Sequence, residues 1–457
     1  MVILIIIISA IFRFYNFGEL FHWTMDEDYW SYLPYNIATG YHFPLIGGHI
    51  AGTGLYSGPL FVYLTAIPAF LTRGHPLGFG LTVAIFGVVN AVFVYYLAKK
   101  MFTAKVAVVS GLLYSGSLLM ALFDRHYWNA SLTPIITTLS VWFVWEIYQK
   151  RNWYFLPLAA VLALGFHAHG TGMAIIVGTI LSLISLRISL RSRLFFLSCL
   201  LFLLLQLPLI IFDLRHDFLN TRALVSYLTT DKKTEFTLKE RADNIFDEFP
   251  KTLGRLFYFP AQDVAVEQTL ALPSEIEVRR ALAPWWLIIG VVGLLVVTIR
   301  DIRRPEIKLL LSFVVATLFG LFFYKAKVPE YFFAPTFVPI FLLMGYGLTK
   351  VPHGWIMTVG LVVANFFVLI NLKHSFGFRP KFAAVQKIAN QNKDVPFAVK
   401  VNCDSRFCQA TGFRYFFTYY GVEPTISDMD PNFLWLYERR ISKQSPEKII
   451  TIDPTSL

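Results

Sequence analysis

Long apolar runs separated by short polar breaks make up the first 372 residues of the chain. Runs of about 16 to 20 residues, enough to cross a hydrocarbon core of about 30 Å, begin near residues 2, 78, 106, 131, 153, 171, 194, 284, 308, 332 and 354. This pattern predicts an all-α membrane protein with about eleven transmembrane helices. The first run ends before Arg13 and has neither a basic leader nor a small-residue cleavage site, which favours an uncleaved first helix.

Basic residues in alternate connections predict the orientation. By the positive-inside rule, the connections that carry them are cytoplasmic. The N-terminus is then cytoplasmic and, with an odd number of spans, the C-terminus is extracytoplasmic. We expect a multi-pass protein of the plasma (inner) membrane. The basic residues are Lys99, Lys100, Lys105, Lys150, Arg151, Arg187, Arg191, Arg193, Arg300, Arg303, Arg304, Lys308 and Lys350.

Two longer polar segments, residues 18–77 and 213–283, fall on the outer side. Within the first, residues 60–71 are apolar but too short to span, which predicts a helix along the membrane surface. Within the second, apolar positions from Ala242 to Phe257 recur at helical spacing and predict an amphipathic interfacial helix that Pro250 interrupts.

The region after residue 372 differs from the rest because helix-like and strand-like segments alternate in it. Residues 382–389 and 412–420 are helix-like, and residues 395–401 and 449–452 are strand-like. Such alternation is typical of a small α/β domain. The predicted organisation is a membrane core of residues 1–372 and an extracytoplasmic α/β cap of residues 373–457.

Composition excludes an ordinary soluble protein. Of the 457 residues 56% are hydrophobic and 15% are charged, whereas soluble domains carry about 25% charged residues. The net charge of +11 arises from the cations in the membrane connections, so we expect no nucleic-acid partner. We expect Cys199, in an apolar run, to be a small buried hydrophobe; Cys403 and Cys408 fit a disulfide and two free thiols equally well.

The strongest chemical signal is the acidic run Asp26-Glu27-Asp28 directly outside the first span. Adjacent like charges and partial desolvation raise carboxyl pKa values, which prepares a carboxylate to act as a general base near neutral pH. A helix N-cap or a solvated acidic loop explains the same residues equally well.

A second acidic candidate, Asp124, lies at the outer end of the third span beside Arg125. The structural interpretation is an ion pair that anchors the interface. The functional interpretation places Asp124 opposite the first acidic group and makes Arg125 a phosphate-binding fork.

Two further pairs fall on the same outer side. His167 and His169 lie between the fifth and sixth spans, where alternate spacing suits one metal only in an extended strand, so a polar pair lining a cavity is favoured. Lys325 and Lys327, with Tyr331, occupy a short outer loop against the positive-inside bias. They fit either snorkelling side chains or a phosphate-binding site. Every candidate therefore lies on one face of the membrane.

Several enzyme classes lack support in this sequence. It contains no Walker phosphate loop, no Gly-rich dinucleotide fingerprint, no His-Glu-x-x-His helix and no Gly-x-Ser-x-Gly elbow. Because no nucleotide-binding motif is present, we expect any reaction to be driven by an activated substrate.

The order of several motifs resembles the GT-C class of integral membrane glycosyltransferases, in particular the family 39-like group with the protein O-mannosyltransferases and the lipid A aminoarabinose transferase. The resemblance covers roughly residues 10–345, and the acidic pair after the first helix is its most specific element. The motifs are Arg13-Phe14-x-x-Phe17-Gly18, Met25-Asp26-Glu27, Gly58-Pro59-Leu60, Arg125-x-x-Trp128-Asn129-x-Ser131-Leu132-x-Pro134, the His169 region, Phe212-Asp213-Leu214-Arg215-His216 and Glu330-Tyr331-Phe332 with Pro335.

The resemblance implies transfer of a hexosyl or pentosyl group from a polyprenyl-phosphate donor to an acceptor hydroxyl at the outer membrane face, with inversion. Asp26 matches the family's general base, and Glu27 would orient the acceptor or that base. Asp124 matches a second acidic residue, which in some members is linked to a divalent metal. The implied metal ligands are Asp26 and Asp124, and the implied donor-binding residues are Arg125, Lys325, Lys327 and Tyr331.

The sequence also departs from the family pattern. Ser57-Gly58-Pro59 replaces the His-Pro-Pro element of aminoarabinose-type members, and the extra sugar-binding module of eukaryotic protein mannosyltransferases is missing. The acceptor, whether protein, lipid or polysaccharide, therefore stays open. A lipid or sugar flippase is the alternative, and it would place ionisable groups near the middle of the membrane. A third hypothesis is a non-catalytic assembly protein that acts through its outer tail.

Overall fold

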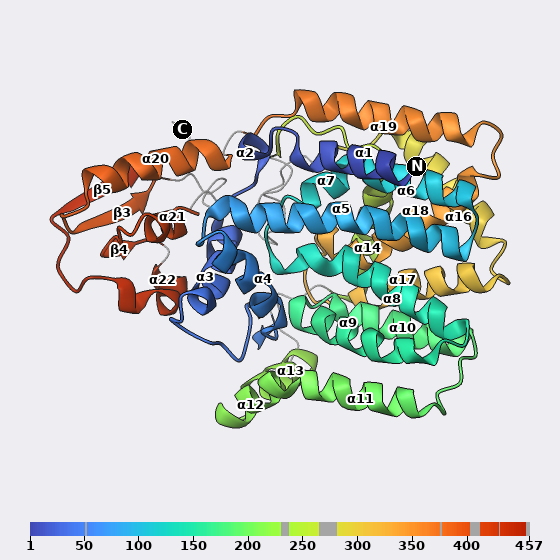
Figure 1. Cartoon of the computed structure of the whole chain (residues 1–457), viewed down its shortest axis with the longest axis horizontal. Coiled ribbons are helices and arrows are strands. Elements are labelled where there is room, and N and C mark those ends of the chain that lie inside the picture. The colour runs from blue at the N-terminus through green and yellow to red at the C-terminus, as the bar shows by residue number, and fades with distance from the viewer. Residues whose placement is uncertain are drawn as a thin grey trace.

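The computed structural model describes residues 1–50, 53–229, 237–264, 281–374, 377–402, 412–428 and 430–453. Long helices lie side by side in a bundle, and a small α/β region projects from one end of it (Figure 1). The bundle helices are α1 (Val2–Phe14), α5 (Pro76–Met101), α6 (Ala104–Ser115), α7 (Leu118–Phe123), α8 (Thr133–Tyr148), α9 (Phe155–Ala168), α10 (Gly172–Ser185), α11 (Arg193–Leu205), α16 (Trp285–Ile299), α17 (Pro305–Leu321), α18 (Ala334–Leu348) and α19 (Gly354–Asn371).

A helix lies at each of the eleven predicted positions, so the predicted all-α membrane fold is confirmed. Among the described residues, four helical stretches are long and apolar enough to cross a membrane: Pro76–Met101, Asn129–Tyr148, Glu330–Leu348 and Gly354–Asn371. The bent pair α11 and α12 (Leu207–Arg215), with 43° between its helices, passes the same test together. Several of the other bundle helices are apolar but shorter, so the number of spans stays a prediction.

The two segments predicted to lie outside the membrane form further helices and one two-stranded sheet, and the helix α14 packs along the bundle. Helix α4 packs its Phe61 and Thr65 face inward and exposes Ile67 and Phe70. Its position along the membrane surface stays a prediction. Helix α14 continues through Pro250 instead of breaking there. These outer elements are α2 (Phe17–Leu20), α3 (Met25–Ala38), β1 (His49–Ile50), β2 (Leu55–Tyr56), α4 (Leu60–Leu71), α13 (Leu219–Thr229) and α14 (Leu238–Phe257); short 3-10 turns η1 (Asn129–Leu132), η2 (Asn152–Tyr154) and η4 (Glu330–Phe333) precede α8, α9 and α18.

The C-terminal region has the predicted α/β character. Its three strands form a parallel sheet in the order β4-β3-β5, with Val399 opposite both Ser427 and Ile450. The boundary at residues 372 and 373 stays a prediction. The elements are α20 (Phe378–Gln391), β3 (Phe397–Val401), α21 (Arg414–Tyr419), β4 (Ile426–Ser427), α22 (Asp430–Phe433), η6 (Leu434–Leu436), η7 (Glu438–Arg440) and β5 (Lys448–Ile452).

The cysteine predictions have different outcomes. Cys199 is exposed on α11, and not buried as expected, because this helix packs only a narrow face on the bundle and leaves most of its apolar side chains outward. Cys403 and Cys408 lie outside the described residues, so their pairing is untested.

Aromatic packing joins the α/β region to the segment that carries the acidic run. The ring of Trp23 lies 4.6 Å from that of Phe416 and 5.9 Å from that of Phe378. The Tyr32 ring meets Tyr415 edge-on at 5.1 Å. The C-terminal region therefore covers the start of α3, where the sequence predicts the catalytic residues.

Candidate active site

The acidic run forms the first turn of α3. Thr24 is the N-cap, and Glu27 Oε2 accepts hydrogen bonds from the backbone N–H (2.8 Å) and the hydroxyl (2.9 Å) of Thr24. This capping box satisfies donors that the helix cannot pair internally, and the N-terminal end of the helix dipole favours the three carboxylates. The N-cap interpretation is therefore correct for Glu27, and it positions Asp26 as well.

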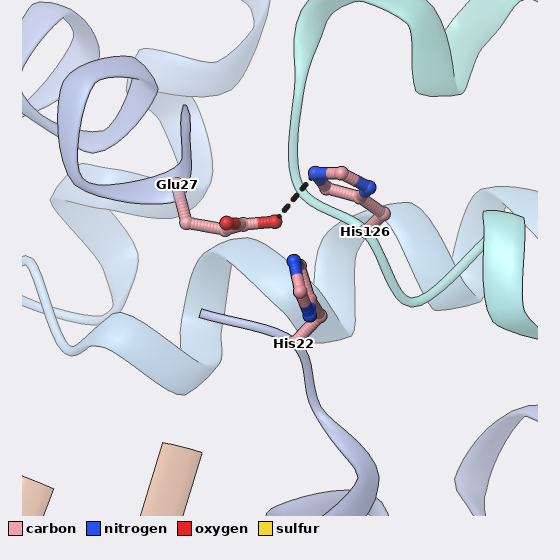
Figure 2. Close-up of side chains that lie close together, drawn as sticks. All are labelled: His22, Glu27 and His126. Atoms are coloured by element: carbon pink, nitrogen blue, oxygen red, sulfur yellow. Dashed lines mark ion pairs between the residues drawn. The ribbon is translucent and has the colours of Figure 1, made fainter. Parts of the chain in front are cut away.

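The second oxygen of Glu27 joins a cluster with two histidines. Glu27 Oε1 lies 2.8 Å from His126 Nε2, and both side chains are buried. His22, also buried, presents its ring to His126 at a centroid separation of 5.0 Å. Figure 2 shows the three side chains converging from three separate backbone segments. Their ligand-type atoms all lie within 4.8 Å of one another.

His374 contacts His22, with its Nε2 3.3 Å from His22 Nδ1. Burial lowers the pKa of His22 well below its usual value, and the nearby His126 ring lowers it further. Burial likewise lowers the pKa of His374 to about 3. One proton lies along the contact between the two neutral rings. In the tautomer in which His22 Nδ1 donates it to His374 Nε2, the other ring nitrogen of His22 carries a lone pair that can bind a metal.

Asp26 lies beside this cluster and is partly exposed. Burial of the carboxyl raises its pKa from 3.8 to about 6, while His126 lowers it and Glu27 raises it. The carboxyl also acts electrostatically on Tyr331, so the two groups are neighbours. A carboxylate with this pKa is a competent proton acceptor near neutral pH.

A wall of stacked rings bounds the site. His126 lies parallel to Trp128 at 4.1 Å, and Trp128 contacts Tyr331 at 4.4 Å. Tyr331 in turn meets His169 at 5.6 Å. The structure therefore brings together Tyr331 and His169, from the predicted set, with Asp26 and Glu27. The buried Trp128 Nε1 has no hydrogen-bond partner in the part of the chain that the structure describes.

Asp124 is engaged by Arg13 of α1. Its Oδ2 lies 2.7 Å from both Nε and Nη2 of Arg13, and both side chains are buried. Gly87 on α5 makes this pair possible, because a Cβ there would overlap Asp124 Oδ2. Asp124 therefore forms an ion pair, as the structural interpretation predicts, but its partner is Arg13 and not the adjacent Arg125.

Arg125 caps the C-terminal end of α1 instead of presenting an open fork. Its Nη2 donates to the carbonyls of Phe12 (2.6 Å) and Tyr15 (3.0 Å), and its Nε donates to the Arg13 carbonyl (3.0 Å). Helix ends leave such carbonyls unpaired, so Nε and Nη2 of the buried guanidinium serve the backbone. Its third nitrogen, Nη1, is buried and has no hydrogen-bond partner among the described residues. The role of Arg125 in phosphate binding stays a prediction.

The remaining predicted residues do not form one group. His167 bonds Gln206 at 2.7 Å and packs on Gly58, where a Cβ would overlap its ring. His169 bonds the Thr171 hydroxyl at 2.9 Å instead, so the two histidines have different partners. The backbone N–H of Lys325 donates to the Tyr227 hydroxyl, and the Lys325 ammonium lies over that ring. Lys327 is exposed.

Sequence reasoning missed five residues of the site. His22, His126 and Trp128 belong to the predicted membrane core, and His374 and Lys381 belong to the C-terminal region. The Lys381 ammonium donates to the Trp23 carbonyl, and burial lowers its pKa to about 8. The Asp124-x-His126 spacing was the available signal for His126. No local pattern marks His374 or Lys381, because only the folded C-terminal region brings them to α3.

Asp28 connects α3 to the C-terminal region. Its Oδ1 accepts from the N–H of Tyr415 (3.0 Å), and its Oδ2 accepts from the N–H of Arg414 (3.0 Å). These are the first N–H groups of α21, which has no other acceptor nearby among the described side chains. The carboxylate is therefore a remote cap for that helix.

We expect Asp28→Ala to loosen the C-terminal region at a cost of about 1–3 kcal/mol, because it leaves buried N–H groups unpaired. Limited proteolysis with mass mapping should show faster cleavage after residue 373 than in the wild type. Glu19→Ala is the matched control, since it removes only an exposed ion pair with Arg379 (2.7 Å) worth about 0–1 kcal/mol. Equal cleavage rates for the two variants would contradict the capping role.

A protein family and several solved structures are similar to this chain. Residues 57–212, about a third of the chain, match the family described as dolichyl-phosphate-mannose-protein mannosyltransferase. The bundle with its C-terminal α/β region has the GT-C fold of solved membrane glycosyltransferases, and the family match lies within its helical bundle. A comparison with curated protein sequences gives no match.

Two solved structures illustrate the similarity. ArnT from Cupriavidus metallidurans bound to undecaprenyl phosphate superposes with a TM-score of 0.65 at 12% identity, over 100% of this chain and 90% of that one. The Archaeoglobus fulgidus oligosaccharyltransferase in complex with Zn and sulfate gives a TM-score of 0.54 at 13% identity, over 93% of this chain and 62% of that one. At these identities the shared property is the fold.

Proposed function

We propose that the chain transfers a hexosyl or pentosyl group from a polyprenyl-phosphate-linked donor to an acceptor hydroxyl at the outer face of the plasma (inner) membrane. The observation that carries this proposal is the position of Asp26. It is a partly exposed carboxylate with a raised pKa, in the first turn of α3, beside Glu27, His126 and Tyr331. The family match and the fold supply the donor class.

In this mechanism Asp26 accepts the proton of the acceptor hydroxyl as its oxygen attacks the anomeric carbon. A new glycosidic C–O bond forms while the bond to the polyprenyl phosphate breaks, and attack from the opposite face inverts the anomeric centre. The departing phosphate takes the electron pair of the broken bond. Lys325 and Lys327 are the proposed cations for that phosphate, and Tyr331 a hydrogen-bond donor, since positive charge stabilises the developing dianion.

The cluster of His22, Glu27 and His126 fits a divalent metal by its donor set. Two imidazoles and one carboxylate are a known zinc set that leaves a position open, and the depressed pKa of His22 keeps its ring neutral, as a ligand must be. We place the ion at this group and not at the pair Asp26 and Asp124, since Arg13 already pairs with Asp124. When bound, such an ion supplies positive charge for phosphate groups.

We expect His126→Ala and His22→Ala each to lower bound Zn²⁺ or Mn²⁺ at least tenfold, because loss of one of three ligands weakens a site strongly. Metal content of the purified protein, measured by inductively coupled plasma mass spectrometry after dialysis, checks this. His75→Ala is the matched control, since His75 lies outside the cluster at the start of α5. Unchanged metal content in both cluster variants would remove the metal from the proposal.

The function is tested by offering radiolabelled polyprenyl-phosphate sugars to the purified chain with membrane extracts as acceptor. We expect label in one acceptor fraction, with the anomeric configuration opposite to that of the donor. Retained configuration would contradict the single-displacement mechanism. A flippase is not favoured, because the ionisable cluster lies at the end of the bundle next to the α/β region and not at its middle (Figure 1).

A further inference from the structure

An open pocket of about 620 Å³ lies at the opposite end of the bundle from the candidate active site. It is formed by the connection between α8 and α9 and by the connection between α10 and α11, and both connections lie at the end away from the strands (Figure 1). Its polar lining includes Gln149, Lys150, Arg187, Ser189, Arg191 and Ser192. Both connections are predicted to be cytoplasmic.

Three of the lining side chains are cations without a neighbouring counter-charge. Lys150, Arg187 and Arg191 form no ion pair with any carboxylate in the described ranges. The nearby buried carboxylate, Glu146, is already bound by Arg151 (2.8 Å) and by Lys100. The pocket therefore presents about three uncompensated positive charges together with hydroxyl and amide groups, a combination that suits a phosphate.

Two of these cations occupy backbone positions where glycine would be more stable. Lys150 has φ 66° and Arg187 has φ 53°, and each lies two residues after the last residue of its helix, α8 or α10. Left-handed residues at such helix ends are usually Gly, because a Cβ is unfavourable there. The chain carries a long cationic side chain at both positions in spite of that cost, and both side chains line the same pocket.

The surroundings of the pocket match the headgroup level of a bilayer. Trp153, 54% exposed, and Tyr154 follow Lys150 on one side, and Ile184, 67% exposed, precedes Arg187 on the other. Aromatic rings of this kind concentrate at the membrane interface, and exposed apolar side chains of bundle helices face the acyl chains. A phosphate in this pocket would therefore be continuous with lipid tails.

We propose that this pocket binds the phosphate headgroup of an anionic glycerophospholipid from the cytoplasmic leaflet. Lys150, Arg187 and Arg191 contact the phosphate, and the serine and glutamine groups bind its polar substituent. Basic pockets between transmembrane helices on this side of a membrane bind such headgroups. The site is separate from the donor site, and so the proposal does not depend on the proposed transferase activity.

The test measures lipid binding by the full-length chain in detergent, by native mass spectrometry and by the lipid-induced rise in Tm. Phosphatidylglycerol is compared with phosphatidylcholine, and inorganic phosphate and glycerol phosphate are offered separately. We expect the wild type to prefer phosphatidylglycerol, and the double variant Lys150→Gly/Arg187→Gly to bind it about 25-fold more weakly, at about fivefold for each cation. Glycine suits both backbone positions, so the double variant should fold.

Two controls make the result specific. Lys99→Gln/Lys105→Gln removes two exposed cations from the same predicted face but outside the pocket, and it should retain the wild-type affinity. Arg73→Gly, at another left-handed position (φ 52°), reports the effect of the glycine alone. Arg191→Gln, with no such backbone constraint, should weaken binding about fivefold.

Three outcomes would overturn the proposal. These are equal affinity of the wild type for the two lipids, an equal loss in the double variant and in the Lys99/Lys105 control, and saturation of the pocket by inorganic phosphate as tightly as by lipid. The last result would assign the pocket to a soluble phosphate compound instead.

Discussion

Replacing Asp26 with Asn should lower kcat/KM for sugar transfer about 10³-fold while the fold and the metal content stay unchanged. The amide has almost the same size, and no hydrogen bond to the Asp26 side chain holds the described structure together. What it removes is the ability to accept a proton, and a positioned general base contributes about 10²- to 10⁴-fold. The measurement is the initial rate of transfer from the identified donor, with Tm recorded in parallel.

The pH profile gives this prediction a second readout. Because burial raises the pKa of Asp26 to about 6, the carboxyl is protonated and inactive below that pH. Wild-type kcat/KM should therefore rise as pH increases through about 6 and level off above about 7, with metal loading held constant. The residual activity of Asp26→Asn should lack this step.

Asp247→Asn is the matched control for Asp26→Asn. Asp247 is an exposed carboxylate on α14 that pairs only with Lys251 among the described residues, so its loss should leave both the rate and the pH profile unchanged. Wild-type rates in Asp26→Asn, or an unchanged acidic limb in its profile, would rule out Asp26 as the base.

The second large effect concerns stability. Replacing Asp124 with Ala should destabilise the protein by about 3–5 kcal/mol, because it leaves the Arg13 guanidinium buried without its counter-charge. Arg13 also donates to the hydroxyl of Ser9 at 2.8 Å, but a neutral acceptor cannot replace a carboxylate. Thermal unfolding in detergent, followed by intrinsic fluorescence, checks the expected drop in Tm.

A double variant separates this structural role from a catalytic one. Arg13→Met/Asp124→Leu removes both charges and fills the space with apolar atoms, which is often close to neutral for a buried pair. We expect most of the lost Tm to return. If Asp124 acts only on Arg13, transfer activity should return with stability; if the fold is restored but activity is not, Asp124 takes part in the reaction itself. A Tm for Asp124→Ala equal to that of the wild type would contradict the pairing.

Much of the membrane architecture follows from sequence because the hydrocarbon core imposes a simple rule. Each span must satisfy its own backbone hydrogen bonds and present apolar side chains over a fixed length, so eleven helix positions can be recognised from hydropathy alone. The α/β character of the C-terminal region is likewise a local signal of alternating periods. The acidic run at Asp26 is conspicuous because carboxylates are costly so close to a membrane.

The helix positions, the α/β character of the C-terminal region and the candidate residues Asp26 and Glu27 can thus be read from local sequence patterns. The groups that meet at the candidate site depend on packing between distant segments. Arg13 lies 111 residues from Asp124, and His374 lies 352 residues from His22. Packing of separate helices, not local spacing, assigned Asp124 to an ion pair, Arg125 to a helix end, and His126 to Glu27. Long-range contacts of this kind depend on which faces pack together, and no linear pattern of residue types encodes that choice.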